Sequence, residues 1–175
     1  MIRIIDNFFD EKIFLNIKNF SKIIPYQPKF FKRSEENKES KEFTSRDTYG
    51  LRFKITHEPE LIKTYENKIK EVFNFKTIKI HEESGIDKRK LDMFKPHKDY
   101  MGKLNLLHMI DGPTDNTNGT VFYSENNEGN YELDIHVGFK ENRAILFPSL
   151  HMHSPAVSKK KIWRTTSTMF IEDYD

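Results

Sequence analysis

The segment Met93-Phe94-Lys95-Pro96-His97-Lys98-Asp99 places a histidine and an aspartate two residues apart. In an extended segment both side chains point to the same side, because strand side chains alternate with a period of two. An imidazole and a carboxylate on one side can hold two adjacent positions around a metal ion. The alternative is a solvated pair at a strand end, since seven histidines give such a spacing readily by chance. The sequence around the pair must decide between these two interpretations.

From residue 76 onward, the hydrophobic pattern has a period of two and is interrupted by turn residues. The pattern predicts strands at residues 77–81, 90–94, 104–110, 120–123, 131–137, 144–147, 151–157 and 164–171. Dense turn residues occupy 111–119 and 126–130, and the second of these segments predicts a hairpin. Many short, evenly spaced strands indicate a sandwich or barrel. We expect a jelly roll (a double-stranded β-helix), which encloses a pocket.

The N-terminal half predicts two amphipathic helices that pack on one face of this sheet. Residues 10–20 form the first, capped by Asp10, with apolar residues at helical spacing. The second begins near Pro59 and ends near Phe73. Residues 3–5 and 44–55 have the pattern of strands. The charged segment 29–41 is interpreted as a mobile surface loop, with a substrate lid as the alternative.

The length and composition favour one globular domain over residues 1–175. Residues 1–75 would provide helical support and early strands, and residues 76–175 the jelly-roll core. Without cysteine, the chain has no disulfide, cysteine nucleophile, cysteine-ligated zinc or iron–sulfur cluster. A net charge of +2 makes a nucleic-acid partner unlikely. The sequence shows no signal peptide and no membrane-spanning apolar run, so we expect a cytoplasmic protein without a membrane partner.

Two histidines downstream could complete a metal site with His97 and Asp99. His151 and His153 lie in the segment Leu146-Phe147-Pro148-Ser149-Leu150-His151-Met152-His153-Ser154-Pro155 and would share one strand face. Two histidines and one carboxylate on one side of a metal leave three positions open, an arrangement typical of non-haem Fe(II) oxygenases. Spacing within the strand alone does not choose between His151 and His153.

The order of motifs resembles the 2-oxoglutarate/Fe(II)-dependent dioxygenase superfamily over roughly residues 90–171. His153 follows Asp99 by 54 positions, and an Arg-x-Thr pair, Arg164 and Thr166, begins 11 positions after His153. Phe-Pro-Ser at 147–149 resembles a signature of prolyl-hydroxylase-like and phage-borne members. The strand at 119–123 is similar to their Gly-Gly-x-Thr-x-Phe motif, with Asn118 where the first glycine is usual.

The resemblance implies that His97, Asp99 and His153 bind Fe(II), because the offset from Phe-Pro-Ser favours His153 over His151. It further implies that 2-oxoglutarate chelates the iron and that dioxygen takes the last open position.

The far carboxylate of 2-oxoglutarate would then need a cation. Arg164 suits this role because its planar guanidinium can bind a carboxylate through two hydrogen bonds, and Thr166 can add a hydroxyl. Asn105 is a further candidate near the cofactor, because it is polar within an apolar strand. Arg52 could line the mouth of the site or lie on the surface, and the same applies to Arg46 and Tyr49.

The function implied is Fe(II)- and 2-oxoglutarate-dependent hydroxylation of a C–H bond in a peptidyl or small-molecule substrate, with release of succinate and CO2. Peptidyl or free proline is the first substrate suggested by the analogy. The alternative is a catalytically inactive jelly-roll module that binds a metal or a small acid. Asp99 argues against a halogenase, a net charge of +2 does not favour a nucleic-acid demethylase, and a zinc hydrolase would leave Arg164 unexplained.

Overall fold

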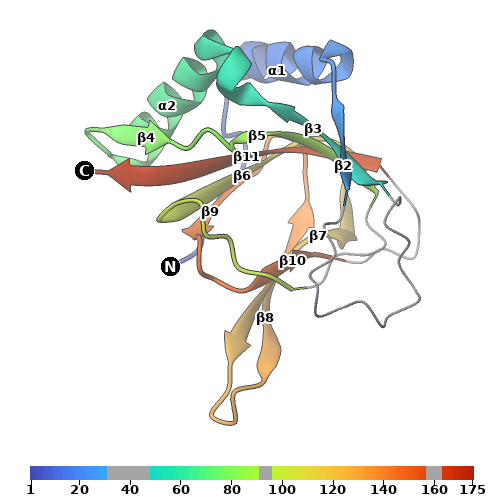
Figure 1. Cartoon of the computed structure of the whole chain (residues 1–175), viewed down its shortest axis with the longest axis vertical. Coiled ribbons are helices and arrows are strands. Elements are labelled where there is room, and N and C mark those ends of the chain that lie inside the picture. Colours follow the sequence, from blue (N-terminus) through green and yellow to red (C-terminus); the bar gives the residue numbers. More distant parts are fainter. Residues whose placement is uncertain (31–47, 91–95, 157–162) are drawn as a thin grey trace.

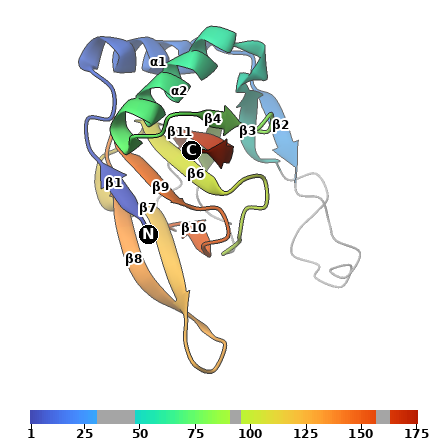
Figure 2. The same ribbon diagram turned by 90° about the vertical axis from the view of Figure 1, so that its left-hand side faces the viewer.

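The computed structural model describes residues 1–30, 48–90, 96–156 and 163–175. Two antiparallel sheets face each other, and two helices cover the outer face of the larger sheet (Figures 1 and 2). This layered β-fold confirms the predicted jelly roll with flanking helices.

The larger sheet has the order β1-β9-β6-β11-β5-β3-β2, with β4 paired to β11. Its strands are β1 (Arg3–Ile5), β2 (Gln27–Phe30), β3 (Thr48–Lys54), β4 (Ile78–Ile80), β5 (Gly85–Lys90), β6 (Leu104–Asp111), β9 (Ala144–Pro148) and β11 (Trp163–Tyr174). The smaller sheet has the order β10-β7-β8. Its strands are β7 (Asp115–Glu125), β8 (Tyr131–Phe139) and β10 (His153–Pro155).

Helices α1 (Glu11–Ile23) and α2 (Pro59–Phe73) form at the two predicted places. The carboxylate of Asp10 accepts a hydrogen bond from the backbone N–H of Ile13 at 3.0 Å and so caps α1. The 3-10 turn Ile55–His57 leads from β3 into α2. Apolar side chains of both helices are buried against β6 and β11 in one core: Phe14, Ile17, Tyr65, Ile69, Phe73, Leu106, Ile110 and Met169. In the part of the chain that the structure describes, no helix has the length and apolar character needed to cross a membrane.

A buried polar network joins the helices to the larger sheet. The ring of His108 lies between the hydroxyl of Tyr65, 2.8 Å from Nδ1, and the amide oxygen of Asn142, 3.3 Å from Nε2. Since the amide oxygen only accepts, Nε2 carries the proton and Nδ1 accepts from Tyr65. The Tyr65 oxygen in turn accepts from the hydroxyl of Ser167 at 2.8 Å. His108 is therefore a neutral imidazole, and burial lowers its pKa to about 4.

A second apolar cluster fills part of the space between the two sheets. Met109, Ile145 and Phe147 come from the larger sheet, and Phe122, Val137 and Phe139 from the smaller. Strand β6 therefore has buried side chains on both of its faces, as its apolar sequence predicts. The cavity beside this cluster is lined by polar and charged side chains together with apolar ones such as Leu107 and Phe170.

Some strand boundaries differ from the predictions. Strand β5 was not predicted, because four of its six residues are charged and the pattern resembles a solvated segment. Strand β7 begins at Asp115, so residues 115–119 are not turn, and an irregularity in its pairing with β8 accommodates this polar stretch. The strand predicted at 151–157 is only His153–Pro155 within the described residues. Residues 29 and 30 belong to β2, whereas 31–41, 44–47 and 91–94 lie outside the described residues.

Candidate metal centre

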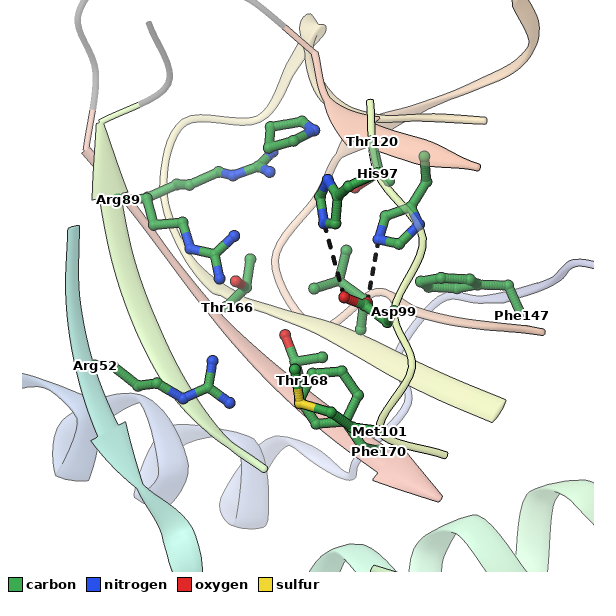
Figure 3. A pocket seen from close by; sticks show the side chains of 14 residues that line it. Arg52, Arg89, His97, Asp99, Met101, Thr120, Phe147, Thr166, Thr168 and Phe170 are labelled. Atoms are coloured by element: carbon green, nitrogen blue, oxygen red, sulfur yellow. Dashed lines mark ion pairs between the residues drawn. The ribbon is translucent and has the colours of Figure 1, made fainter. Parts of the chain in front are cut away.

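Three of the predicted site residues come together at one end of the space between the sheets. Nε2 of His97 lies 3.8 Å from Asp99 Oδ1, and Nε2 of His153 lies 3.4 Å from Asp99 Oδ2 (Figure 3). One potential ligand atom from each residue lies within 4.8 Å of the others. The backbone holds this arrangement, because the N–H groups of His97 and His153 each donate to the other residue's carbonyl, at 2.9 and 3.0 Å.

The donor set fits a metal such as Fe(II). Two ligands at right angles, each about 2.1 Å from a metal, lie about 3 Å apart, so the separations of 3.8 and 3.4 Å from Asp99 need only a small contraction. Nδ1 of His153 lies 2.8 Å from the carbonyl oxygen of His151 and must donate to it, which leaves the lone pair of Nε2 for a metal. The His151 ring instead packs 5.6 Å from the Phe122 ring and is not part of the cluster. The structure therefore places His153 rather than His151 in the triad.

Hydrogen bonds fix the orientation of the Asp99 carboxylate. Nδ2 of Asn105 donates to Asp99 Oδ2 at 2.6 Å, and the hydroxyl of Ser149 donates to Asn105 Oδ1 at 2.8 Å. The backbone N–H of Asp99 donates to the carbonyl of Ser149 at 2.9 Å. This arrangement gives Asn105 a position beside a candidate ligand and Ser149, the serine of the Phe-Pro-Ser motif, a structural role. Supporting hydrogen bonds of this kind orient metal ligands.

The electrostatic surroundings keep Asp99 ionised. Burial opposes the charged carboxylate, but the side-chain contact with His153 and the electrostatic effects of His153, His97 and Arg89 outweigh it and lower the pKa of Asp99. An ionised carboxylate is the form that binds a metal.

The triad opens into a cavity of about 220 Å³ between the sheets. Figure 3 shows His97 and Asp99 in the middle, with Phe147 on one side and Arg52 and Arg89 on the other. Arg164 and Thr166 also line this cavity. Thr168 and Phe170, which follow Thr166 by two and four residues on β11, line it as well. The alternation of β11 therefore brings the two predicted co-substrate residues to the same space as the triad.

Arg164 is a buried cation in this wall. Its Nη1 donates to the carbonyl oxygen of Gly119 and lies 3.5 Å from Oδ1 of Asn118. The Nε of Arg164 is buried and makes no hydrogen bond within the described part of the chain. Burial, together with the charge of Arg89, lowers the pKa of Arg164 to about 9, yet the group stays protonated near neutral pH. A guanidinium in this setting is suited to an anionic ligand.

The structure adds two cavity residues to those selected from the sequence. Arg52, left undecided between pocket and surface, is buried and lines the cavity, and Arg89 on β5 lines it as well. Both contact the fully buried carboxylate of Asp87. The alternation of Gly85, Asp87 and Arg89 on one side of β5 was the available signal for Arg89.

Comparisons with known proteins find similarity in structure only. No family model and no curated protein sequence matches the chain. One similar solved structure is the non-heme α-ketoglutarate-dependent epimerase SnoN from nogalamycin biosynthesis. It has a TM-score of 0.68 at 8% sequence identity, and the match covers 98% of this chain and 77% of the epimerase chain. An oxidoreductase of the 2OG-Fe(II) oxygenase family from Burkholderia pseudomallei has a TM-score of 0.62 at 12% identity, covering 98% and 84%.

A prolyl hydroxylase from Trichoplax adhaerens, solved with a fragment of the hypoxia inducible factor, has a TM-score of 0.61 at 14% identity, covering 98% and 83%. This chain has the fold of the 2OG-Fe(II) oxygenases. The resemblance found in the sequence is thereby confirmed for the fold. In this oxygenase fold the His-Asp-His cluster and the buried arginine occupy one cavity between the sheets.

Proposed function

We propose that the protein is an Fe(II)- and 2-oxoglutarate-dependent dioxygenase that hydroxylates a C–H bond of its substrate and releases succinate and CO2. One observation carries the proposal: a His-Asp-His cluster and a buried arginine share a single cavity. The cluster supplies three protein ligands on one side of a metal and leaves the other side open. The arginine supplies a positive charge for a dicarboxylate that reaches from the metal into the cavity.

Each residue has a defined task in this function. His97, Asp99 and His153 would hold the metal, with Asn105 orienting the carboxylate of Asp99. Arg164 would bind the far carboxylate of 2-oxoglutarate, and Thr166 on the same strand face would add a hydroxyl donor. Fe(II), 2-oxoglutarate and dioxygen supply the oxidative chemistry when they are bound.

Hydroxylation is proposed rather than halogenation because the triad includes a carboxylate ligand, Asp99, which halogenases lack. One solved structure with this fold is an epimerase and another is a prolyl hydroxylase, so the fold itself is compatible with more than one reaction. A peptidyl or small-molecule substrate fits this range of neighbours.

The proposal is tested by anaerobic titration of the protein with Fe(II) and then with 2-oxoglutarate. A weak visible charge-transfer band that needs both additions is expected for the wild type. It should be lost in His153→Ala and kept in the matched variant His151→Ala, which removes an imidazole two residues away. In Arg164→Gln, the affinity for 2-oxoglutarate should fall by about 30-fold or more, while Fe(II) affinity changes little, because a buried charged partner is worth about 2 kcal/mol or more.

The outcomes distinguish a dioxygenase from the alternative, a catalytically inactive binding module. Succinate release in air with the wild type supports the dioxygenase, and formation of the band without succinate for any substrate supports a binding module. If the band never forms, or if Arg164→Gln binds 2-oxoglutarate as well as the wild type, the assignment of the triad or of the arginine is wrong.

A further inference from the structure

We propose that Arg89 and Arg52 form a second anion-binding site in the same cavity, which recognises a carboxylate or phosphate group on the substrate to be oxidised. This inference rests on the proposed function, because it assigns 2-oxoglutarate to Arg164 and the substrate's anion to the other two arginines. Both arginines line the cavity of the triad.

Strand pairing brings the two arginines to the cavity face. Arg52 on β3 lies opposite Asp87 on β5, and Asp87 lies opposite Thr166 on β11. Arg89 lies between Gly50 on β3 and Arg164 on β11. Paired residues share a face, so these side chains lie with Arg164 and Thr166 on the inner face of the sheet.

The pairing also leaves space for the Arg89 side chain. A Cβ at Gly50 would lie 3.0 Å from Cγ of Arg89, which is closer than ordinary van der Waals contact. The glycine therefore allows Arg89 to lie across β3 toward the cavity.

One buried carboxylate positions both guanidinium groups. Asp87 Oδ2 lies 3.0 Å from Nη1 of Arg52 and 3.2 Å from Nη2 of Arg89. Arg52 is further held by a hydrogen bond to the carbonyl of Glu83, and its guanidinium lies 5.9 Å from the centre of the Phe170 ring. The side chains of Arg52, Asp87 and Arg89 together carry one net positive charge. The arrangement holds two guanidiniums in place before a ligand arrives.

Arg89 shares the cavity with both parts of the proposed active site. It lies opposite Arg164 in the pairing of β5 with β11, and it lines the same cavity as His97 and Asp99. In Figure 3, Arg52 and Arg89 face His97 and Asp99 across the cavity. An anion held by these arginines would therefore place the rest of its molecule close to the metal position.

The charges of the cavity favour an anionic substrate over a neutral one. Among the described lining residues, Asp99 is the carboxylate and Arg52, Arg89 and Arg164 are the permanent cations. Fe(II), the Asp99 carboxylate, the Arg164 guanidinium and the two carboxylates of 2-oxoglutarate sum to zero. Within the described residues, the group of Arg52, Asp87 and Arg89 adds one formal positive charge to the wall of this cavity, and a complementary anion is favoured there over a neutral group.

This site distinguishes classes of substrate. A free amino acid or another small acid presents a carboxylate, and a phosphorylated molecule presents a phosphate, whereas an uncharged residue within a peptide presents neither. The inference therefore favours a small acid over an internal peptide segment.

The test measures binding of acetate and of inorganic phosphate by calorimetry under argon, with the full chain loaded with Fe(II) and 2-oxoglutarate and, separately, with the unloaded chain. Arg89→Gln should weaken binding of the preferred anion by about 10-fold or more, as expected for loss of a charge-assisted hydrogen bond, and should change 2-oxoglutarate affinity less than threefold. Lys88→Gln is the matched control, because it removes the same charge from the other face of the same strand. It should leave anion binding unchanged.

A second variant keeps the test valid if Arg89→Gln folds poorly. The double variant Arg52→Gln/Asp87→Asn removes one charge of each sign, so the net charge of the cavity is preserved while the arrangement that positions Arg89 is lost. It should also weaken anion binding.

The possible results separate this inference from the proposed function. Tighter binding of phosphate or of acetate identifies the anion class. If neither anion binds the loaded protein, or if Arg89→Gln weakens 2-oxoglutarate instead, the second site does not exist as described. If 2-oxoglutarate fails to bind the wild type while Arg89-dependent anion binding persists in the unloaded chain, the proposed function fails and the anion site stands.

Discussion

Acidification should destabilise the fold through His108, the buried imidazole that links α2 to the larger sheet. The native ring is neutral, with Nδ1 accepting from Tyr65 and Nε2 donating to Asn142. Protonation would place a second proton on Nδ1. This proton would conflict with the hydroxyl proton that Tyr65 donates to Nδ1 in the native state. Protonation would also place a charge among the rings of Phe8 and Phe9, 5.8 and 5.3 Å away. His108 therefore binds a proton more weakly in the native state than in the unfolded chain.

The size of this effect follows from the two pKa values. Burial lowers the pKa of His108 from 6.5 to about 4, so between these values the unfolded state binds more protons than the native state. Stability is thus fully present above pH 6.5 and falls as the pH decreases through this window. Linkage gives a loss of about 2 kcal/mol at pH 5 and about 3 kcal/mol at pH 4 from this single group.

Urea denaturation at pH 7.5 and at pH 5.0 measures this loss, with His108→Gln as the reference. Glutamine can accept from Tyr65 and donate to Asn142 but does not titrate, so it removes the pH dependence of this site. Carboxylates such as Asp6, whose pKa is lowered to about 2 by hydrogen bonds from Arg143 and Lys140, titrate in both proteins and cancel. The wild type should lose about 2 kcal/mol more than the variant between the two pH values. Equal losses would refute a neutral, desolvated His108.

Substitutions at Asn105 and Gly119 test the support of the site, and a substitution at Gly129 serves for comparison. Asn105→Ala removes the hydrogen bond to Asp99 and should weaken Fe(II) binding by about 10- to 100-fold in competition with a chelator; unchanged affinity would contradict an orienting role. Gly119→Ala would place a Cβ 2.0 Å from the carbonyl oxygen of Val137 and should cost about 3 kcal/mol in urea denaturation, whereas Gly129→Ala, at a hairpin φ of 79°, should cost about 1 kcal/mol. Similar losses for the two glycines would show that the strands separate to admit the side chain.

The sequence identified a site residue where the residue type does not match the pattern of the surrounding strand. Asn105 is polar within an apolar strand, and this mismatch correctly indicated a buried partner, which is the Asp99 carboxylate. The strand periodicity of β11 correctly placed Arg164 and Thr166 on one face. The choice between His151 and His153 could not be made from periodicity, because both have the same parity. The choice depends on which of the two residues pairs with the backbone of His97. This pairing is a tertiary contact, and the structure shows it for His153.

The arginine group was missed for a different reason. Strand β5 has the sequence Gly-Ile-Asp-Lys-Arg-Lys, and such a charged stretch usually indicates a solvated segment. It is buried because β3 and β11 pair with it on both sides, which places Asp87 at the centre of three strands. Neither neighbour can be inferred from the local sequence. The burial of Asp87 then depends on Arg52, from a strand 35 residues earlier in the chain.

Strand β11 explains why the fold and the proposed site depend on the same register. Arg164, Thr166 and Thr168 face the cavity, whereas Ser167 between them joins the network of Tyr65 and His108 on the outer face. A shift of one residue would exchange these two sets and place a guanidinium in the aromatic core. The hydrogen bonds of the Ser167 hydroxyl and of Arg164 Nη1 form in only one register, so the packing on the outer face and the polar contacts on the inner face require the same register. The apolar packing under the helices therefore positions the charges of the cavity, although none of its side chains lines that cavity.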